Sequence, residues 1–143
     1  MLKDLFKADN SFVGPILRLT LVIMMLPMGY LKIIDFSNML EILKSSYNLP
    51  ALIAFLVIVI EFFVPLLLLV GLGSRIGGLL LAILMLGALT YHIPYGYHMN
   101  WYNLQEGEGF QFHLLAIGTS LALFASGGGR WSIDKVLVRA IEK

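Results

Sequence analysis

Four stretches of the chain are nearly free of charge and long enough to cross a membrane. They run over about 12–31, 50–72, 76–95 and 110–126, and short polar or glycine-rich segments separate them. A helix needs about 20 mainly apolar residues to cross the hydrocarbon of a bilayer. Because only a tight glycine-rich joint ending at Arg75 connects the second and third stretches, these helices should be antiparallel neighbours. The pattern predicts an all-α fold, an up-down-up-down four-transmembrane-helix bundle that forms one membrane domain over residues 1–143.

Two further segments read as short amphipathic helices. In residues 35–49 apolar side chains recur at helical spacing, which predicts a helix lying on the outer face of the membrane. Residues 132–142 follow three glycines and begin at Ser132, a good helix cap. Lys135 and Arg139 on the polar side of this helix suit an anionic inner leaflet. Between the third and fourth stretches, residues 91–102 are crowded with tyrosine and tryptophan, as in the aromatic belts at headgroup level.

Composition places the chain in the membrane class. Hydrophobic residues make up 59% and charged residues 13%, against about 25% charged residues in soluble domains. A net charge of +1 without a basic stripe argues against nucleic-acid binding. The absence of cysteine excludes disulfides, thiol redox chemistry and cysteine-ligated metals, so a redox role would require a bound cofactor or a partner. The segment from Met1 to Asp4 lacks the arrangement of a signal peptide, so we expect the first apolar stretch to be retained.

The basic residues predict an orientation. Both termini and the Arg75 joint carry seven lysines and arginines, whereas the other side carries only Lys32 and Lys44. The seven are Lys3, Lys7, Arg75, Arg130, Lys135, Arg139 and Lys143. Cytoplasmic segments are enriched in these residues, so both termini should be cytoplasmic in a bacterial-type plasma or inner membrane.

Glu61 is the first candidate for function, because it lies near the middle of the second stretch. A carboxylate at that depth costs several kcal/mol unless it is paired, protonated or facing water. Arg18 could lean toward it, and the pair would then act as a structural clamp; alternatively Arg18 extends to the headgroups. In the functional alternative, Glu61 lines a cavity and binds a quinone oxygen, a proton or a small polar ligand. Pro65 lacks an N–H and therefore leaves the carbonyl of Glu61 open as well.

Other polar residues allow several interpretations. Lys32 returns to nearly the same helix face as Arg18, so it either lines the bundle or anchors the helix at the interface. His92, His98 and His113 are all predicted on the outer side, where Gln111 and two glutamates are close in sequence. Such a group can bind a divalent ion, line the binding site of a polar ligand, relay protons or simply lie at the interface. Haem between His92 and His113 is a further alternative. The spacing fits no established metal signature, so we assign no metal site.

These residues also carry a family resemblance. The motifs, in chain order, are Arg18-Leu19, Gly29 to Lys32, Glu61, Leu66 to Arg75, Met99 to Asn103, Gly107 to Leu115 and Gly127 to Asp134. In their order and spacing the chain resembles the DoxX family of small four-helix integral membrane proteins. Relatives in that family include a subunit of thiosulfate:quinone oxidoreductase and components of membrane-associated oxidative-stress complexes. The resemblance thus implies a quinone-linked or redox-accessory role. Gln111 stands where the family usually has a glutamate, and it cannot ionise.

The leading hypothesis is an accessory membrane subunit with a pocket between the helices that opens toward the outer face. Its lining would be Arg18, Lys32, Glu61, His92, Gln111 and His113. Glu61 or a histidine would hydrogen-bond a quinol oxygen and accept its proton, while electrons pass to a membrane or cytoplasmic partner. Glu61 is the candidate catalytic residue, although the chain is not expected to be a complete enzyme by itself. The alternatives are a non-enzymatic scaffold that recruits a partner through its last helix, and a small transporter subunit that works only as a homo-oligomer.

The orientation can be tested directly because the chain contains no cysteine. We expect Asn38→Cys to react with a membrane-impermeant maleimide in intact cells. Lys135→Cys should react only after the cells are permeabilised. The reverse labelling pattern would place both termini outside.

Overall fold

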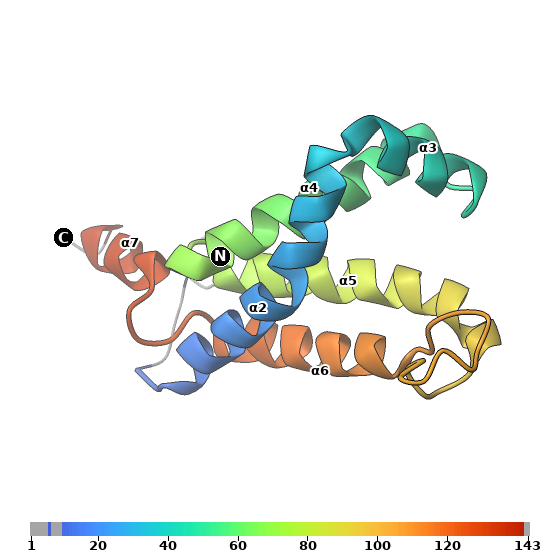
Figure 1. Cartoon of the computed structure of the whole chain (residues 1–143). Helices are drawn as coiled ribbons and strands as arrows, with labels where there is room; N and C mark the ends of the chain where they lie inside the picture. Colours follow the sequence, from blue (N-terminus) through green and yellow to red (C-terminus); the bar gives the residue numbers. More distant parts are fainter. Residues whose placement is uncertain (1–5, 7–9, 142–143) are drawn as a thin grey trace.

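The structure is a computed structural model that describes residue 6 and residues 10–141 (Figure 1). Within this part the chain is helical and has no strand. The elements are α2 (Val13–Ile34), α3 (Phe36–Ser45), α4 (Ala51–Val70), α5 (Ser74–His92), the 3₁₀ turn η1 (Ile93–Tyr95), α6 (Gln111–Ser126) and α7 (Ile133–Ile141). The segment from Met1 to Asp4, Lys7, Lys143 and the predicted end of the last helix at 142 lie outside the described residues.

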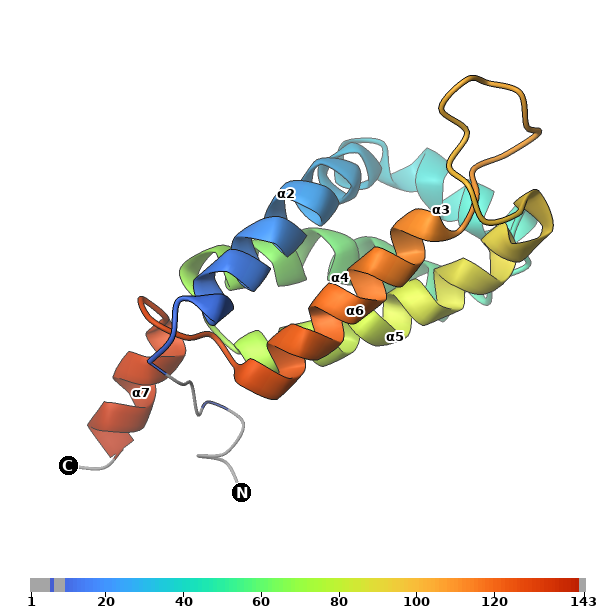
Figure 2. The ribbon, with the colours of Figure 1, turned by 90° about the horizontal axis from the view of Figure 1, so that it is seen from below.

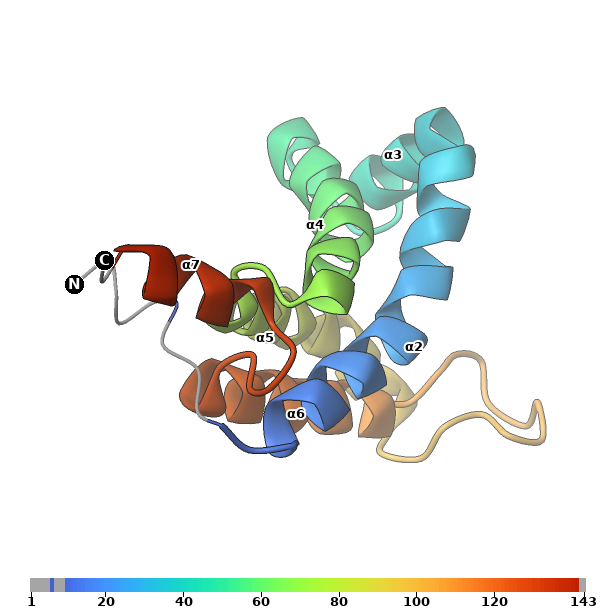
Figure 3. The same cartoon turned by 90° about the vertical axis from the view of Figure 1, so that its left-hand side faces the viewer.

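Helices α2, α4, α5 and α6 run alternately between two ends of the molecule (Figure 1). The α7 end contains the start of α2, the turn 71–73, the segment 127–132 and α7 itself. The loop end contains α3, η1 and the loop 96–110. Figure 2 shows α5 and α6 side by side along their length, and α2 crossing close to α4. Figure 3 looks at the α7 end, where α7 projects to one side of the bundle.

The prediction of four membrane spans is confirmed for three of them. Among the described residues, α2, α4 and the segment 74–95 are long and apolar enough to cross a membrane. The fourth, α6, is apolar but has only 16 residues, which is about 24 Å of helix. The two predicted short helices are present as α3 and α7. Ser132 Oγ accepts a hydrogen bond from Lys135 N at 3.4 Å, in agreement with the predicted cap of α7.

The helices meet around an apolar core and present an apolar outside. The fully buried core side chains include Leu21 of α2, Leu68 of α4, Leu81 of α5 and Leu123 of α6. Large apolar side chains also cover the surface; Ile23, for example, is 73% exposed. Soluble monomers do not expose apolar surface on this scale. The exposed positions are therefore the expected contacts with lipid.

Glycines allow two of the helix contacts to be very close. A Cβ on Gly78 of α5 would lie 2.7 Å from the carbonyl oxygen of Ser120 in α6. A Cβ on Gly29 of α2 would lie 2.3 Å from the carbonyl oxygen of Glu61 in α4. That carbonyl has no backbone donor within α4, because Pro65 occupies the position that would supply it. The crossing of α2 and α4 is therefore fixed at Gly29, and it sets the position of Glu61.

Asp134 ties α7 to the bundle. Its side chain is 1% exposed, and its two oxygens accept hydrogen bonds from Gly73 N at 2.6 Å and Ser74 N at 2.8 Å. These N–H groups belong to the start of α5, where helical partners are missing and a negative charge is favourable. Asp134 N in turn donates to the carbonyl of Gly71 at 3.0 Å. One residue from the C-terminal segment thus caps the helix on the other side of the 71–73 turn.

The crossing of α2 and α4 makes Gly29 sensitive to small changes. We expect Gly29→Ala to lower the stability of the detergent-solubilised protein by about 1–3 kcal/mol, because the methyl group would overlap the backbone of Glu61. Gly87→Ala is the matched control, since a Cβ at that helical glycine meets nothing within 4 Å. It should be neutral or slightly stabilising. Thermal unfolding followed by circular dichroism would measure both; equal effects of the two changes would contradict the close contact at Gly29.

Candidate functional site

The candidate site is a buried polar cluster in the half of the bundle nearer the loop end. At its centre Lys32 Nζ of α2 donates to Glu61 Oε2 of α4, in a short salt bridge. The Glu61 side chain is 7% exposed and the Lys32 side chain 22% exposed. The carboxylate is therefore buried and paired, while the ammonium group remains within reach of the surface. A pair of this kind satisfies the requirement that a buried charge have a partner.

Two histidines from the other pair of helices complete the cluster. The rings of His92, at the end of α5, and His113, in the first turn of α6, have their centroids 4.3 Å apart and are tilted by 34°. Helix α2, which carries Lys32, packs against α6, which carries His113, and the charge of Lys32 acts on the imidazole. His92 Nδ1 is 2.8 Å from the carbonyl oxygen of Glu108 in the loop. The cluster thus extends from the buried Glu61 to the base of the exposed loop.

His113 has a polar atom that the protein leaves unsatisfied. The residue is 8% exposed, and its Nδ1 is buried without a hydrogen-bond partner in the structure. An unpaired buried polar atom costs about 1–3 kcal/mol. Lys32 also retains donors beyond the one that it gives to Glu61. The cluster therefore contains more hydrogen-bonding capacity than its own contacts use, which is what a site for a polar group or a proton requires.

Arg18 does not join this cluster. Of the two alternatives predicted for Arg18, the contact with Glu61 is therefore wrong. The guanidinium is 4% exposed and lies at the α7 end. Its Nη1 donates to the carbonyl of Leu68 at 3.1 Å, and its Nη2 donates to the carbonyls of Arg130 and Trp131 at 3.3 and 3.2 Å. Leu68 is two turns of α4 away from Glu61, which is about 10 Å along the helix. Arg18 thus caps carbonyl groups, and the partner of Glu61 is Lys32 instead of Arg18.

Gln111 is also separate from the buried cluster, because it is the exposed first residue of α6. Its backbone N–H closes the base of the loop by donating to the carbonyl of Tyr97 at 3.0 Å. His98 is likewise exposed. Of the six predicted lining residues, the structure brings together Lys32, Glu61, His92 and His113, and it places Arg18 and Gln111 elsewhere.

Two pockets in the described residues do not coincide with the cluster. One, of about 230 Å³, is formed by loop residues between His98 and Gln105. The other, of about 640 Å³, is an apolar groove between α2 and α4 with Pro27, Tyr30 and Phe62 in its wall. Neither contains any of the six predicted residues, and residues 10–141 contain no group of three or more acidic or histidine side chains placed to hold a metal ion. The parts of the cluster that reach the surface are the exposed part of Lys32 and the half-buried His92.

Sequence reasoning assigned no role to the Asp134 carboxylate. The signals were its position after the three glycines and Ser132, which was interpreted as the beginning of an interfacial helix, and its place in the motif from Gly127 to Asp134. Its actual partners are the backbone amides of Gly73 and Ser74, which lie about sixty positions earlier in the chain. Such a contact has no local pattern in the sequence.

The pairing of Lys32 with Glu61 can be tested by comparing the free energies of unfolding of single and double variants. We expect Glu61→Leu to destabilise the protein by up to about 3–5 kcal/mol, because it leaves the Lys32 charge without its partner in a position that is only partly exposed. The double change Lys32→Met with Glu61→Leu should restore most of this loss. Glu41→Gln is the control, because it removes an exposed ion pair with Lys44 and should change stability by less than about 1 kcal/mol. A double variant no more stable than Glu61→Leu would contradict the pairing.

Comparison with known proteins agrees with this architecture. The DoxX family model matches residues 15–93, which cover α2 to α5 and therefore both members of the Lys32–Glu61 pair. The motifs from Met99 onward lie outside the matched range. No curated protein and no solved structure matches the chain. With more than half of its length matched, and with helices apolar enough to span a bilayer, the chain is an integral membrane protein that belongs to the DoxX family.

Proposed function

We propose that this protein is the membrane subunit of a quinone-linked redox system, and that the Lys32–Glu61–His113–His92 cluster binds the polar head group of the quinone. The observation that carries the proposal is the buried, unpartnered Nδ1 of His113 beside the buried salt bridge. A quinone head group has carbonyl oxygens that accept hydrogen bonds, and when bound it would carry electrons and protons to or from a partner protein.

The residues of the cluster divide the task by their chemistry. Lys32 has free N–H donors and partial exposure, so it would be the first to hydrogen-bond an incoming carbonyl oxygen. His113 would hold or donate a proton at Nδ1, where the protein offers no competing partner. Glu61 keeps Lys32 in place and balances its charge. His92 stands between His113 and the loop, and it would connect the buried site with water.

The orientation of the protein is part of the proposal. Arg75, Arg130, Lys135 and Arg139 all lie at the α7 end. Under the positive-inside rule this end is cytoplasmic, so the polar cluster is in the outer half of a bacterial-type plasma membrane. A short α6 that packs along α5 would then serve as the fourth span, since a bilayer can thin locally around a short helix.

A second candidate function is a scaffold that holds a cytoplasmic partner. It is favoured by α7, which Asp134 ties rigidly to the start of α5 while Ile133, Val136 and Leu137 remain exposed at 40%, 65% and 37%. In this alternative the Lys32–Glu61 pair only fixes the register of α2 and α4. The two functions differ in whether the isolated protein binds a quinone.

Quinone binding can be measured on the purified protein. We expect native mass spectrometry in mild detergent to detect a complex with decylubiquinone. His113→Leu should weaken this complex at least about tenfold, a loss of roughly 1.4 kcal/mol, because both ring nitrogens are removed and no hydrogen-bonding atom replaces them. His98→Leu, a change of an exposed histidine at the same end, is the matched control and should bind like the unchanged protein. An absorbance spectrum of the same sample tests the haem alternative.

The result depends on both variants being folded, which circular dichroism and size-exclusion chromatography establish. No complex with the unchanged protein, or equal affinities for all three proteins, would overturn the proposal. A cytoplasmic protein that co-purifies while no quinone is bound would support the scaffold.

A further inference from the structure

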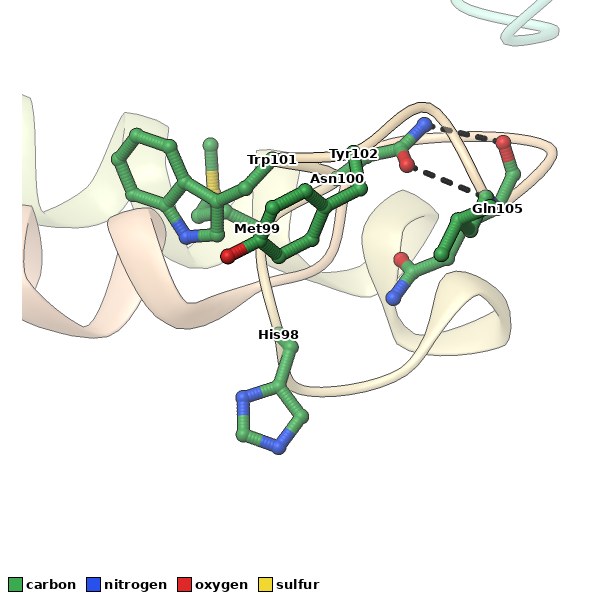
Figure 4. Close-up of a pocket in the computed structure, with 7 residues that line it drawn as sticks. His98, Met99, Asn100, Trp101, Tyr102 and Gln105 are labelled. Carbon is green, nitrogen blue, oxygen red and sulfur yellow. Dashed lines mark hydrogen bonds between the residues drawn. The ribbon is translucent and has the colours of Figure 1, made fainter.

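The loop 96–110 is held in shape by its own hydrogen bonds. Its base is closed by Phe110 N, which donates to the carbonyl of Gly96 at 3.1 Å. At its tip, Asn100 Nδ2 donates to the carbonyl of Gln105 at 2.9 Å, and Asn100 Oδ1 accepts from Gln105 N at 3.1 Å (Figure 4). Glu108 Oε2 accepts from Asn100 N at 2.9 Å. The two hydrogen bonds between the Asn100 side chain and the backbone of Gln105, called the crossbar below, therefore fix the conformation of residues 100–105.

This crossbar displays three large apolar side chains to the outside. Trp101, Tyr102 and Leu104 are 78%, 83% and 85% exposed, which makes them the most exposed large apolar residues of the described chain. The loop stands out to one side of the helices, away from α4 and α7 (Figures 2 and 3). Because the hydrogen bonds of the loop hold these apolar side chains outward, we expect them to contact something outside the chain.

The residue types of the loop indicate what these side chains contact. Tryptophan and tyrosine favour the headgroup region of a bilayer, where the ring is in contact with apolar chains and the polar atom with water. The loop lies at one end of the spanning helices, which is the level of the headgroups. Between Ile93 and Phe112 there is no lysine or arginine, whereas Glu106 and Glu108 are acidic. Attraction to anionic lipid is therefore absent, and the surface fits zwitterionic headgroups.

We infer that the tip of this loop, Trp101 to Leu104, is a membrane anchor that inserts into the zwitterionic headgroup layer at the loop end of the bundle. It holds the base of the loop, and with it His92 and Glu108, at the water–lipid boundary. The inference does not depend on quinone binding, because it concerns only the contact of the loop with lipid.

The experiment uses the fact that the chain has two tryptophans. Trp131→Phe leaves Trp101 as the sole tryptophan, and this protein is reconstituted into phosphatidylcholine vesicles. The fluorescence of Trp101 is then quenched with nitroxide lipids labelled either at the headgroup or deep in the acyl chain. We expect emission at a shorter wavelength than in water, and quenching by the headgroup label about twofold stronger than by the deep label. Adding phosphatidylglycerol should leave the quenching unchanged.

A second variant tests the role of the crossbar. Asn100→Ala in the same single-tryptophan protein removes the side-chain bonds to Gln105 and should reduce the quenching by the headgroup label. Water-like emission of Trp101 without lipid quenching would overturn the inference. So would a blue shift that grows with the ratio of protein to lipid, because the loop would then contact a second copy of the chain.

Discussion

A charged or polar group inside a membrane bundle must find its partner within the protein, and this requirement places the three most deeply buried charges of the described chain. Asp134 satisfies the amides at the start of α5, Arg18 satisfies carbonyls at the end of α4 and in the segment that leads to α7, and Glu61 is satisfied by Lys32. Water is absent from the hydrocarbon, so each unsatisfied group there would cost several kcal/mol. These three sets of contacts constrain how the helices cross and which path the C-terminal segment takes.

The two ends of the molecule pack their polar groups in different ways. At the α7 end glycines bring the backbone so close that no space remains: a Cβ on Gly14 would lie 2.5 Å from the backbone of Gly128, and one on Gly71 would lie 2.3 Å from Arg18 Nη1. At the loop end side chains face each other instead, and one of them, His113, retains an unpartnered nitrogen. Buried polar atoms without a hydrogen-bond partner occur at both ends, because Arg18 Nε and Ser74 Oγ at the α7 end also lack one. What distinguishes the loop end is that its unpartnered atom, His113 Nδ1, belongs to a ring stacked near a second histidine.

Much of the fold could be predicted from the sequence because the bilayer restricts the alternatives. Runs of apolar residues indicated α2, α4 and α5 within a few residues of their observed bounds, and the glycine-rich joint indicated the sharp turn between α4 and α5. The need for a partner at Glu61 was also predictable. The choice of partner was not, because Arg18 and Lys32 share a helix face and only the oblique path of α2 decides which of them reaches Glu61 (Figure 1). That path depends on the close contact of Gly29 with the backbone of Glu61, which joins residues far apart in the chain.

The position of Glu61 bears on how the polar cluster can work. Its carbonyl is held against Gly29, so α4 cannot shift along α2 without a backbone clash, and the carboxylate is fixed in depth. Lys32 lies near the end of α2, where the helix leads into α3 and the side chain is partly exposed. A fixed carboxylate and a more accessible ammonium group form an asymmetric pair: a ligand oxygen can compete for the ammonium group without displacing the backbone. Binding at this site would therefore exchange one hydrogen bond of Lys32 for another, and the helix crossing would stay in place.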